Sequence, residues 1–219
     1  MAKPGPKPRP MSDFVWSPNL AYAVGLLVTD GSLSNDGRHI DLTSKDIEQL
    51  RNFKRCLGIK NKIGYKTYGF SDKKCARLQF SDSGLYRFLE SIGFTPAKTK
   101  TVGMISLPDK YFFDFLRGHH DGDGCFYSYW DPRWRSSFMY YLTFISASEK
   151  HVLWLQEKLK TLLSVNGKIN KARTIYQLRY AKSESLKILK KMYPNKNVIC
   201  LSRKRLKVEK ALGIVGDRL

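Results

Sequence analysis

The chain has 219 residues, 42% of them hydrophobic, and its 39 lysines and arginines outnumber its 19 aspartates and glutamates to give a formal net charge of +20. No apolar run reaches the roughly 20 residues of a membrane span, no apolar stretch near the start resembles a secretory signal, and the four scattered cysteines favour neither a zinc ribbon nor a disulfide framework. We therefore expect an intracellular protein with no membrane partner, in an organelle or in a bacterial or phage-infected cytoplasm, whose charge favours binding to a nucleic-acid backbone.

The positive charge is spread along the whole chain. Residues 1–107 hold 17 basic and 9 acidic residues, or +8, and residues 108–219 hold 22 and 10, or +12, which sum to +20. Residues 1–12 form a basic, proline-rich segment that predicts a flexible tail able to follow a phosphate backbone.

The first predicted helix ends at Asp30. Ser17 is a suitable N-cap and Pro18 suits the first helical position, so the helix should begin there. Its residues up to Asp30-Gly31 are apolar on nearly every side, which indicates burial against more than one neighbour.

Four strands and two helices are expected to follow. Asp36-Gly37 between two alternating runs predicts a tight hairpin. Apolar residues at helical spacing predict one helix over 46–57 and another over 83–92, with a second hairpin over 62–68 and 75–80 between them. The first half therefore has the order αββαββα.

The second half repeats this order. A helix that ends at Asp123-Gly124 is followed by a hairpin, a helix, a second hairpin and a helix, predicted over 125–130 with 138–145, 148–163, 168–172 with 175–180, and 183–192. We predict an α+β fold of two pseudo-symmetric αββαββα repeats, residues 13–107 and 108–219, each with a four-stranded antiparallel sheet. The two helices that end in Asp30 and Asp123, here called the motif helices, should pack together at the centre.

Small residues indicate how closely the motif helices could pack. Ala21 and Gly25 on the first helix, and Gly118 and Gly122 on the second, leave a face without bulky side chains. Crossing there would bring together two helix ends, each with a carboxylate and free backbone carbonyls. Two such carboxylates repel unless a cation lies between them, and hard oxygen ligands favour Mg²⁺, which can activate a nucleophile. The alternative is that both Asp-Gly pairs are ordinary helix-ending turns.

The two histidines before Asp123 are metal-ligand types, but neighbouring residues on a helix point in different directions. We therefore expect His119 and His120 to pack in the interior or in an interface. The segment 121–124 resembles the start of a calcium-binding loop, yet the twelfth position of such a loop would be Pro132 rather than glutamate, which removes that option.

These features resemble the LAGLIDADG homing endonuclease family in its single-chain form with two motif copies. The resemblance rests on segments 20–31 and 112–124, on the stretch 105–118 that leads into the second, and on the repeated order of elements. Ala23, Val28 and the two histidines depart from the family pattern, but the last acid and the glycines of each motif are intact. These departures affect how tightly the two motif helices are expected to pack.

The resemblance implies a monomeric DNA endonuclease that serves the homing of a mobile intron or a similar element. It implies that Asp30 and Asp123 hold Mg²⁺ or Mn²⁺, with Ca²⁺ able to bind without supporting cleavage. The backbone carbonyls of Thr29 and Gly122 would be further ligands. Each strand of double-stranded DNA would be cut once, leaving short 3′ overhangs.

The resemblance also implies a basic residue near the site in each half, after the fourth strand and its helix. By position, Lys98 and Lys196 are the candidates for this catalytic role. The alternative is that both are solvated lysines in loops.

The two curved sheets would form a saddle over DNA. Alternation along each strand sends every second side chain away from the helices, where basic, polar and aromatic groups suit hydrogen bonding to base edges in a major groove. A merely solvated sheet face is the alternative. Because the halves differ at these positions, the target should be long and at most partly palindromic. The predicted DNA-contacting residues are Ser32, Ser34, Asp41, Lys62, Lys66, Tyr68, Arg77 and Gln79 in the first half, Tyr127, Tyr129, Tyr141, Thr143, Lys168, Asn170, Gln177 and Arg179 in the second, and Arg133 and Arg135 at the tip of its extended hairpin.

Two other functions are compatible with the basic surface. An RNA maturase of the same fold would bind intron RNA and would not need both acids. A sequence-specific DNA-binding regulator that does not cut would not need them either. The presence of both acids favours the endonuclease.

Overall fold

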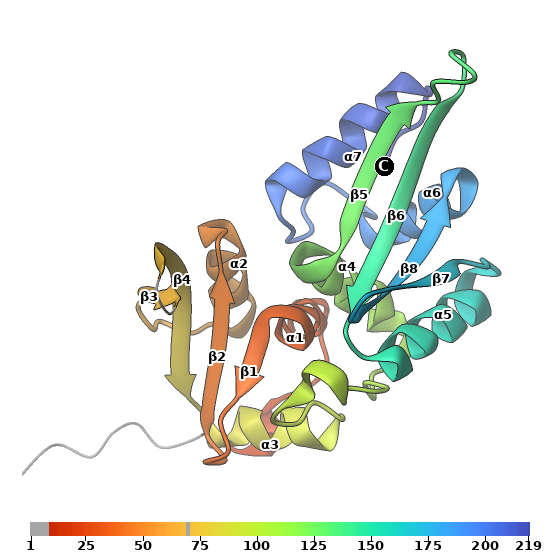
Figure 1. Cartoon of the computed structure of the whole chain (residues 1–219). Helices are drawn as coiled ribbons and strands as arrows, with labels where there is room; N and C mark the ends of the chain where they lie inside the picture. The colour runs from red at the N-terminus through yellow and green to blue at the C-terminus, as the bar shows by residue number, and fades with distance from the viewer. Residues whose placement is uncertain (1–8, 69–70) are drawn as a thin grey trace, which may run out of the picture.

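The two motif helices lie side by side at the centre, with one four-stranded sheet on each side of them (Figure 1). The computed structural model describes residues 9–68 and 71–219, apart from the side chains of residues 68 and 71–73. Residues 1–8 of the predicted tail and the Tyr68 side chain therefore lie outside the described residues. The predicted α+β fold with two similar halves is confirmed.

The first half follows the predicted order of elements. Its antiparallel sheet has the strand order β1-β2-β4-β3. The elements are α1 (Pro18–Asp30), β1 (Gly31–Leu33), β2 (His39–Ser44), α2 (Ile47–Leu57), β3 (Gly64–Tyr68), β4 (Ser71–Ser81) and α3 (Ser83–Ser91), with short 3₁₀ helices at Met11–Asp13 and Lys98–Lys100.

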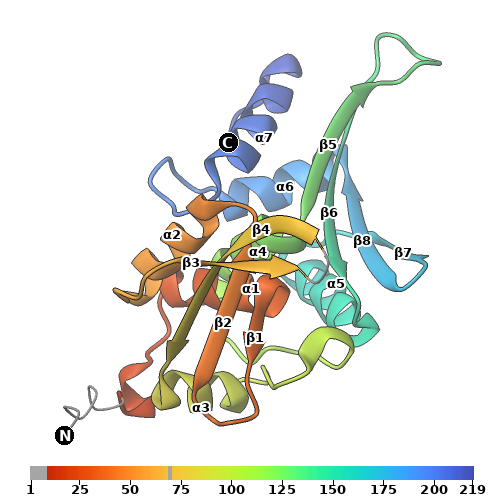
Figure 2. The same ribbon diagram turned by 60° about the vertical axis from the view of Figure 1, so that its left-hand side comes forward.

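The second half has the equivalent strand order β5-β6-β8-β7 and one helix more than predicted. Its elements are a 3₁₀ turn (Asp109–Tyr111), α4 (Phe112–Asp123), β5 (Cys125–Trp130), β6 (Phe138–Ser146), α5 (Glu149–Leu163), β7 (Lys168–Ala172), β8 (Ile175–Ala181), α6 (Lys182–Met192) and α7 (Ser202–Ile214). The additional helix, α7, packs beside β5 (Figure 2). Five of its thirteen residues are lysine or arginine, and they obscure the helical spacing of the buried Val208, Ala211 and Leu212.

Side-chain caps begin the helices of the first half. Ser17 Oγ accepts a hydrogen bond from the Leu20 amide at the start of α1 (3.1 Å), and the Asp46 and Asp82 carboxylates cap α2 and α3 in the same way. Gly58 ends α2 in the left-handed region, with φ of 65°. These local signals explain why the helix bounds lie close to the predicted ones.

One face of each sheet is covered by helices and the other is open. α2 and α3 pack on the first sheet, and α5 and α6 on the second. Alternating residues point toward these helices and are buried, so the residues between them point away from the helices. The buried set includes Ile40, Leu42, Leu78 and Phe80 in the first sheet and Leu142, Phe144, Leu178 and Tyr180 in the second.

The motif helices α1 and α4 touch through their backbones. A Cβ atom at Gly25 would overlap the Phe115 carbonyl oxygen and lie 2.7 Å from the His119 amide nitrogen. A Cβ atom at Gly118 would overlap the Tyr22 carbonyl oxygen, so the contact is reciprocal. Although α1 is apolar, neither it nor any other helix in the described residues is long and apolar enough to cross a membrane.

Ala21, the third residue predicted for this helix interface, is fully buried on α1. It lies one turn before Gly25 on the helix. Its contact with α4 stays a prediction.

The described end of the predicted tail is packed against the first half. The Arg9 guanidinium donates a hydrogen bond to the Asp82 carboxylate (2.8 Å) and lies 4.8 Å from the ring centre of Phe14. Met11–Asp13 forms a 3₁₀ turn. Residues 9–12 at the described end of the segment thus include an ion pair and an aromatic contact, and the flexibility of the segment stays a prediction.

We expect Gly118→Ala to lower the free energy of unfolding by about 2 kcal/mol or more, because the new methyl group meets backbone that cannot move without separating the helices. Urea unfolding measures this change. Gly213→Ala in α7 is the matched control, since a Cβ atom there meets nothing within 4 Å. It should leave stability unchanged or raise it by up to about 1 kcal/mol. A Gly118→Ala protein as stable as the wild type would contradict the close contact.

Candidate active site at the ends of the motif helices

Asp30 and Asp123 are the last residues of α1 and α4, and the two helix ends adjoin. A Cβ atom at Gly122 would lie 2.7 Å from Oδ2 of Asp30. Asp30 and Gly122 line a cavity of about 550 Å³, and Asp123 and Thr29 line a second cavity of about 330 Å³. Each acid therefore shares a cavity with the end of the opposite helix.

Burial raises the pKa of both carboxyl groups. For Asp30, a hydrogen bond from Gln49 lowers the pKa in part, the nearby Asp123 raises it further, and Lys98 and Lys204 lower it. Asp123 is more exposed, yet desolvation in this crowded site also raises its pKa, and the same two lysines oppose the shift. The charged pair therefore lacks some of the stabilisation that water would provide, and a bound cation would supply it.

Gln49 on α2 holds the Asp30 carboxylate. Its Nε2 donates a hydrogen bond to Oδ2 of Asp30 (2.6 Å), and its own Oε1 accepts one from Ser44 Oγ (2.9 Å). His151 lies at the equivalent position of α5, but its Nδ1 faces the Gly103 carbonyl oxygen (2.7 Å). Within the described part of the chain, Asp123 has no such side-chain partner, so the two acids have different surroundings.

Lys98 lies where the sequence places it, beside the motif helices. Its buried Nζ donates hydrogen bonds to the carbonyl oxygens of Val28 and Thr29, the latter at 2.8 Å. Burial lowers the pKa of this lysine to about 8, although Asp123 and Asp30 act in the opposite direction. Lys98 therefore brings a readily deprotonated amine to the site.

Lys196 is not the equivalent residue in the second half. It is exposed in the loop after α6, where its carbonyl oxygen accepts a hydrogen bond from Arg205 (3.1 Å). Lys204 on α7 takes the expected place. Its Nζ donates to the carbonyl oxygens of His120, Gly122 (3.2 Å) and Gly124 (2.8 Å) at the end of α4. The prediction for Lys196 is wrong because the chain enters another helix before it returns to the site.

The start of α7 is anchored to the first half. Ser202 donates hydrogen bonds to the Glu48 carboxylate, and Arg203 pairs with Asp46 at 2.7 Å. Upstream, the Cys200 carbonyl oxygen accepts a hydrogen bond from Asn52 of α2 (2.9 Å). These contacts hold Lys204 in place from α2. The sequence signals for this helix are the spacing of Val208, Ala211 and Leu212, which are buried, and the i,i+4 spacing of Arg205 and Glu209.

The carbonyl oxygens of Thr29 and Gly122, which the resemblance implies as metal ligands, are bonded to Lys98 and Lys204. Nowhere in residues 9–68 and 71–219 do three or more His, Cys, Asp or Glu residues form a group that could hold a metal. The donors at this site are two carboxylates and helix-end carbonyls. All are hard oxygen atoms, the type that Mg²⁺ prefers, so the donor set fits such an ion.

The polar residues that precede Asp123 are buried in the core. Asp121 accepts hydrogen bonds from the Tyr22 hydroxyl and the Leu201 amide, both at 2.7 Å, and burial raises its pKa to about 6. His119 stacks on His151 with ring centres 5.2 Å apart, and both rings are buried. Asp121 thus ties α1, α4 and the chain before α7 together, while His119 and His120 pack in the interior.

The open face of the first sheet carries most of the residues predicted to contact DNA. Asp41 and Arg77 form an ion pair on neighbouring strands. Lys62 is exposed ahead of β3, so its predicted place within the strand is wrong, while its contact with DNA stays a prediction. The other described residues of this set, all exposed, are Ser32, Ser34, Lys66 and Gln79.

The open face of the second sheet is aromatic. Tyr127, Tyr129 and Tyr141 have nearly parallel rings with centres 5.0 to 6.4 Å apart. Thr143 is a correction, because it is buried beside its cross-strand neighbour Arg179 instead of being exposed on the open face. The remaining residues of this set are exposed or half-buried: Arg133, Arg135, Lys168, Asn170, Gln177 and Arg179.

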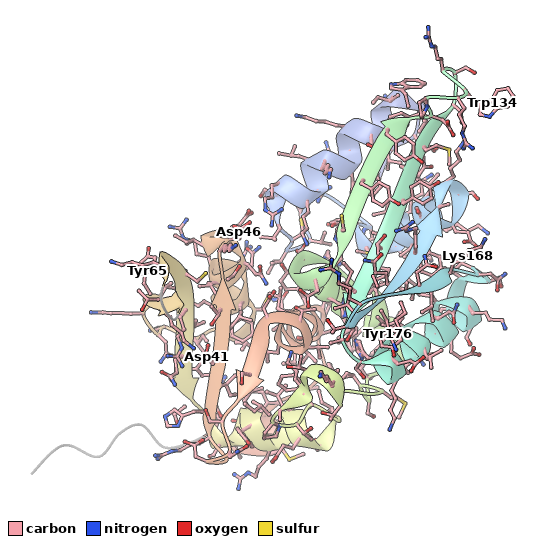
Figure 3. The ribbon with its side chains drawn as sticks, viewed as in Figure 1. Asp41, Asp46, Tyr65, Trp134, Lys168 and Tyr176 are labelled. Atoms are coloured by element: carbon pink, nitrogen blue, oxygen red, sulfur yellow. The ribbon has the colours of Figure 1, made fainter. Side chains whose placement is uncertain are left out.

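The extended hairpin between β5 and β6 projects from the second half. Figure 3 shows Trp134 at its far end and Lys168 near β7. Arg133 at this tip is mostly exposed and pairs with Asp131 (3.2 Å). Its contact with DNA, like those of the other residues on the sheet faces, stays a prediction.

No protein-family model and no curated protein matches this sequence. The solved structures do contain similar folds. The homing endonuclease I-WcaI bound to its DNA recognition sequence is 12% identical, with a TM-score of 0.62 over 90% of this chain and 89% of that one. The N-terminal LAGLIDADG domain of DUF199/WhiA is 17% identical, with a TM-score of 0.55 over 90% and 88%.

The chain has the LAGLIDADG fold. Full-length DUF199/WhiA from Thermatoga maritima also matches, at 15% identity and a TM-score of 0.59 over 94% of this chain. This chain spans only 64% of the length of that protein. Endonucleases and a domain of a larger protein thus share this fold with the chain. The fold alone does not determine the activity.

The lowered pKa of Lys98 predicts a dependence of stability on pH. The folded protein holds this amine with a pKa of about 8 against 10.5 ordinarily, so between these values the unfolded chain binds more protons. Without divalent metal, the stability of the wild type relative to Lys98→Met should rise with pH across this interval, by up to about 3 kcal/mol. Denaturant unfolding below, within and above the interval measures it. If the stabilities of the two proteins changed with pH in the same way, the Lys98 amine would not have a lowered pKa in the folded protein. Lys100→Met, at an exposed lysine, is the control.

Proposed function

We propose that this protein is a divalent-metal-dependent DNA endonuclease that cuts each strand of a long, at most partly palindromic duplex once, leaving short 3′ overhangs. The observation that carries the proposal is the convergence of Asp30 and Asp123 at the adjoining ends of α1 and α4, between two open sheet faces. A similar solved structure is a homing endonuclease bound to DNA, which supports double-stranded DNA as the partner.

Mg²⁺ is the metal that the donors suit best. Asp30 and Asp123 would hold it, since a cation offsets the burial that raises the pKa of both. The helix-end carbonyls of Thr29 and Gly122 are available as further ligands where the lysines release them. When bound, the metal would polarise the phosphate and activate the attacking water.

Three side chains of the protein complete the site. Lys98 and Lys204 each bring an amine to a helix end, and positive charge there stabilises the negative charge that builds up on the phosphate. Lys98, with a pKa of about 8, can also exchange a proton near neutral pH. Gln49 fixes the orientation of the Asp30 carboxylate and, by donating a hydrogen bond, favours its charged form.

The charge of the whole chain supports DNA as the substrate. The net charge of +20 attracts a phosphate backbone, and both halves contribute to it. Basic and polar side chains occupy the open faces of both sheets. Binding should weaken steeply with added salt, because each neutralised phosphate releases counterions.

A second function, sequence-specific DNA binding without cleavage, is favoured by one observation. Amines already occupy the carbonyl oxygens of Thr29 and Gly122, so the site is partly neutralised without metal. Cleavage of duplex DNA on addition of Mg²⁺ distinguishes the two functions. The endonuclease is the better proposal, because a protein that only binds DNA would gain nothing from two desolvated carboxylates.

We expect Asp30→Asn and Asp123→Asn each to abolish double-strand cleavage of a target selected from a randomised duplex library, with rates reduced by at least about 10³-fold. DNA affinity should be preserved, since each change removes a negative charge. Plasmid linearisation and a gel-shift assay measure the two properties. Linearisation at the wild-type rate by either variant would eliminate the proposed mechanism.

Lys204 and Lys196 provide a matched pair of lysines that differ in position. Lys204→Met should slow cleavage by about 10²-fold, because the amine at the end of α4 is lost. Lys196→Met removes the same charge from an exposed loop and should leave the rate nearly unchanged. Single-turnover rates at saturating protein separate these effects from binding. If Lys196→Met were the slower enzyme, the assignment of Lys204 would be wrong.

A further inference from the structure

The two motif acids lie in cavities of different chemistry. Asp30 lines the larger one, of about 550 Å³, together with the polar or charged Lys45, Gln49 and Arg203, and this is here called the Asp30 cavity. Asp123 lines the smaller Asp123 cavity, of about 330 Å³. Most of the other residues that line the Asp123 cavity are apolar, namely Val28, Val102, Ile145, Ala147 and Ile175. One acid therefore has polar and basic surroundings, and the other has mainly apolar ones.

The difference arises at equivalent positions of the two halves. Asp46 is the N-cap residue of α2, and Ser148 is that of α5. The residues just before these caps, Lys45 and Ala147, are therefore equivalent. Lys45 lines the Asp30 cavity, and Ala147 lines the Asp123 cavity. The repeat thus places an ammonium group in one half where the other half has a methyl group.

The basic groups of the Asp30 cavity can still bind an anion. Lys45 is exposed between β2 and α2, and none of the ion pairs among the described residues involves it. Arg203 pairs with Asp46 through Nε alone, at 2.7 Å, which leaves its two Nη groups to donate elsewhere. A phosphate oxygen that enters this cavity therefore meets donors with positive charge.

The acids also differ in how firmly they are held. Gln49 donates a hydrogen bond to Oδ2 of Asp30 at 2.6 Å. His151, at the equivalent position of α5, faces the Gly103 carbonyl oxygen instead. A carboxylate that is already oriented needs less reorganisation during the reaction. The Asp30 end of the site is therefore the better prepared of the two.

The buried lysines do not account for this difference, because each helix end has one. Lys98 donates to carbonyl oxygens at the end of α1, and Lys204 donates to those at the end of α4. Burial lowers the pKa of both amines. The groups without an equivalent in the other half are Lys45 and Gln49, and both lie on the side of Asp30.

We propose that the two strands are cut in a fixed order, and that the strand whose phosphate enters the Asp30 cavity is cut first. Lys45 contacts this phosphate, and Gln49 is a positioning residue that acts through Asp30. A duplex with one strand cut then accumulates before the double-strand break. The inference rests on the proposed endonuclease function and adds to it the order of the two cuts.

Each cut consumes one water molecule. The oxygen of the water forms a bond to phosphorus, and the bond from phosphorus to one deoxyribose oxygen breaks. One proton of the water ends on that deoxyribose oxygen, and the other leaves to solvent. The two cuts are the same reaction, so their rates differ only through the surroundings of the two phosphates.

The test follows both strands of one target during a single turnover of the full chain with Mg²⁺. A duplex selected from a randomised library carries a different label on each strand, and the same target in a supercoiled plasmid reports nicked and linear products. Wild-type protein should cut one strand roughly 10-fold or more faster than the other, because a charged hydrogen bond and an oriented carboxylate act on one side only. Nicked plasmid should therefore appear before linear plasmid.

Lys45→Ala should slow the strand that wild type cuts first by about 10-fold and leave the other strand nearly unchanged, so that little nicked plasmid accumulates. Ala147→Lys places an ammonium group beside Asp123 and should speed the second cut. Lys150→Ala removes the same charge as Lys45→Ala from an exposed position of α5 that lines neither cavity, and should change neither rate.

Gln49→Met separates positioning from structural support. The variant removes the hydrogen bond to Asp30 at similar side-chain volume, so the first cut should slow more than the second. A role confined to stabilising the fold predicts instead that both strands slow by the same factor, and that result would remove Gln49 from the proposal.

Three results would overturn the inference. These are equal rates for the two strands in wild type, a Lys45→Ala protein that slows the strand cut second, and a ratio of rates that neither Lys45→Ala nor Ala147→Lys changes. If wild type left both strands intact with Mg²⁺ and with Mn²⁺, the proposed function itself would fail, and this inference with it.

Discussion

The backbone contact between α1 and α4 at Gly25 and Gly118 is the constraint on which the rest of the structure depends. Atoms of the opposite helix fill the space where side chains would be, so a larger residue at either glycine would force the helices apart. Asp30 and Asp123 are the last residues of the two helices, only a few residues after these glycines. The two carboxylates are therefore close together because of backbone sterics. The helix contact at the glycines holds them there in spite of their mutual repulsion.

Much of the fold could be predicted because its signals are local and occur twice. Capping residues, an Asp-Gly turn and helical spacing define the elements, and the repeat reveals which acids are equivalent. Lys204 could not be found in this way, because it belongs to a helix outside the repeat and reaches the site through contacts with α2. The Asp41–Arg77 pair and the burial of Thr143 depend on strand register, which alternation alone does not specify.

The two halves share a backbone plan and the same pair of acids, but the side chains around those acids and on the open sheet faces differ. Gln49 supports one acid, whereas the equivalent His151 turns into the core. Asp41 pairs with Arg77 on one open sheet face, whereas the Tyr127 ring lies beside Arg179 on the other. Duplication of a fold thus supplied the geometry, and divergence of the side chains made the sides unequal, as binding to an asymmetric duplex would require.

The anchoring of residues 200–204 to α2 has a mechanical consequence. Asp46 and Glu48, which hold Arg203 and Ser202, flank the turn of α2 that carries Gln49. A torque on the first half would therefore shift Gln49 at one acid and Lys204 at the other helix end together. The two halves would therefore move as one body, and a displacement of either half would change the surroundings of both Asp30 and Asp123.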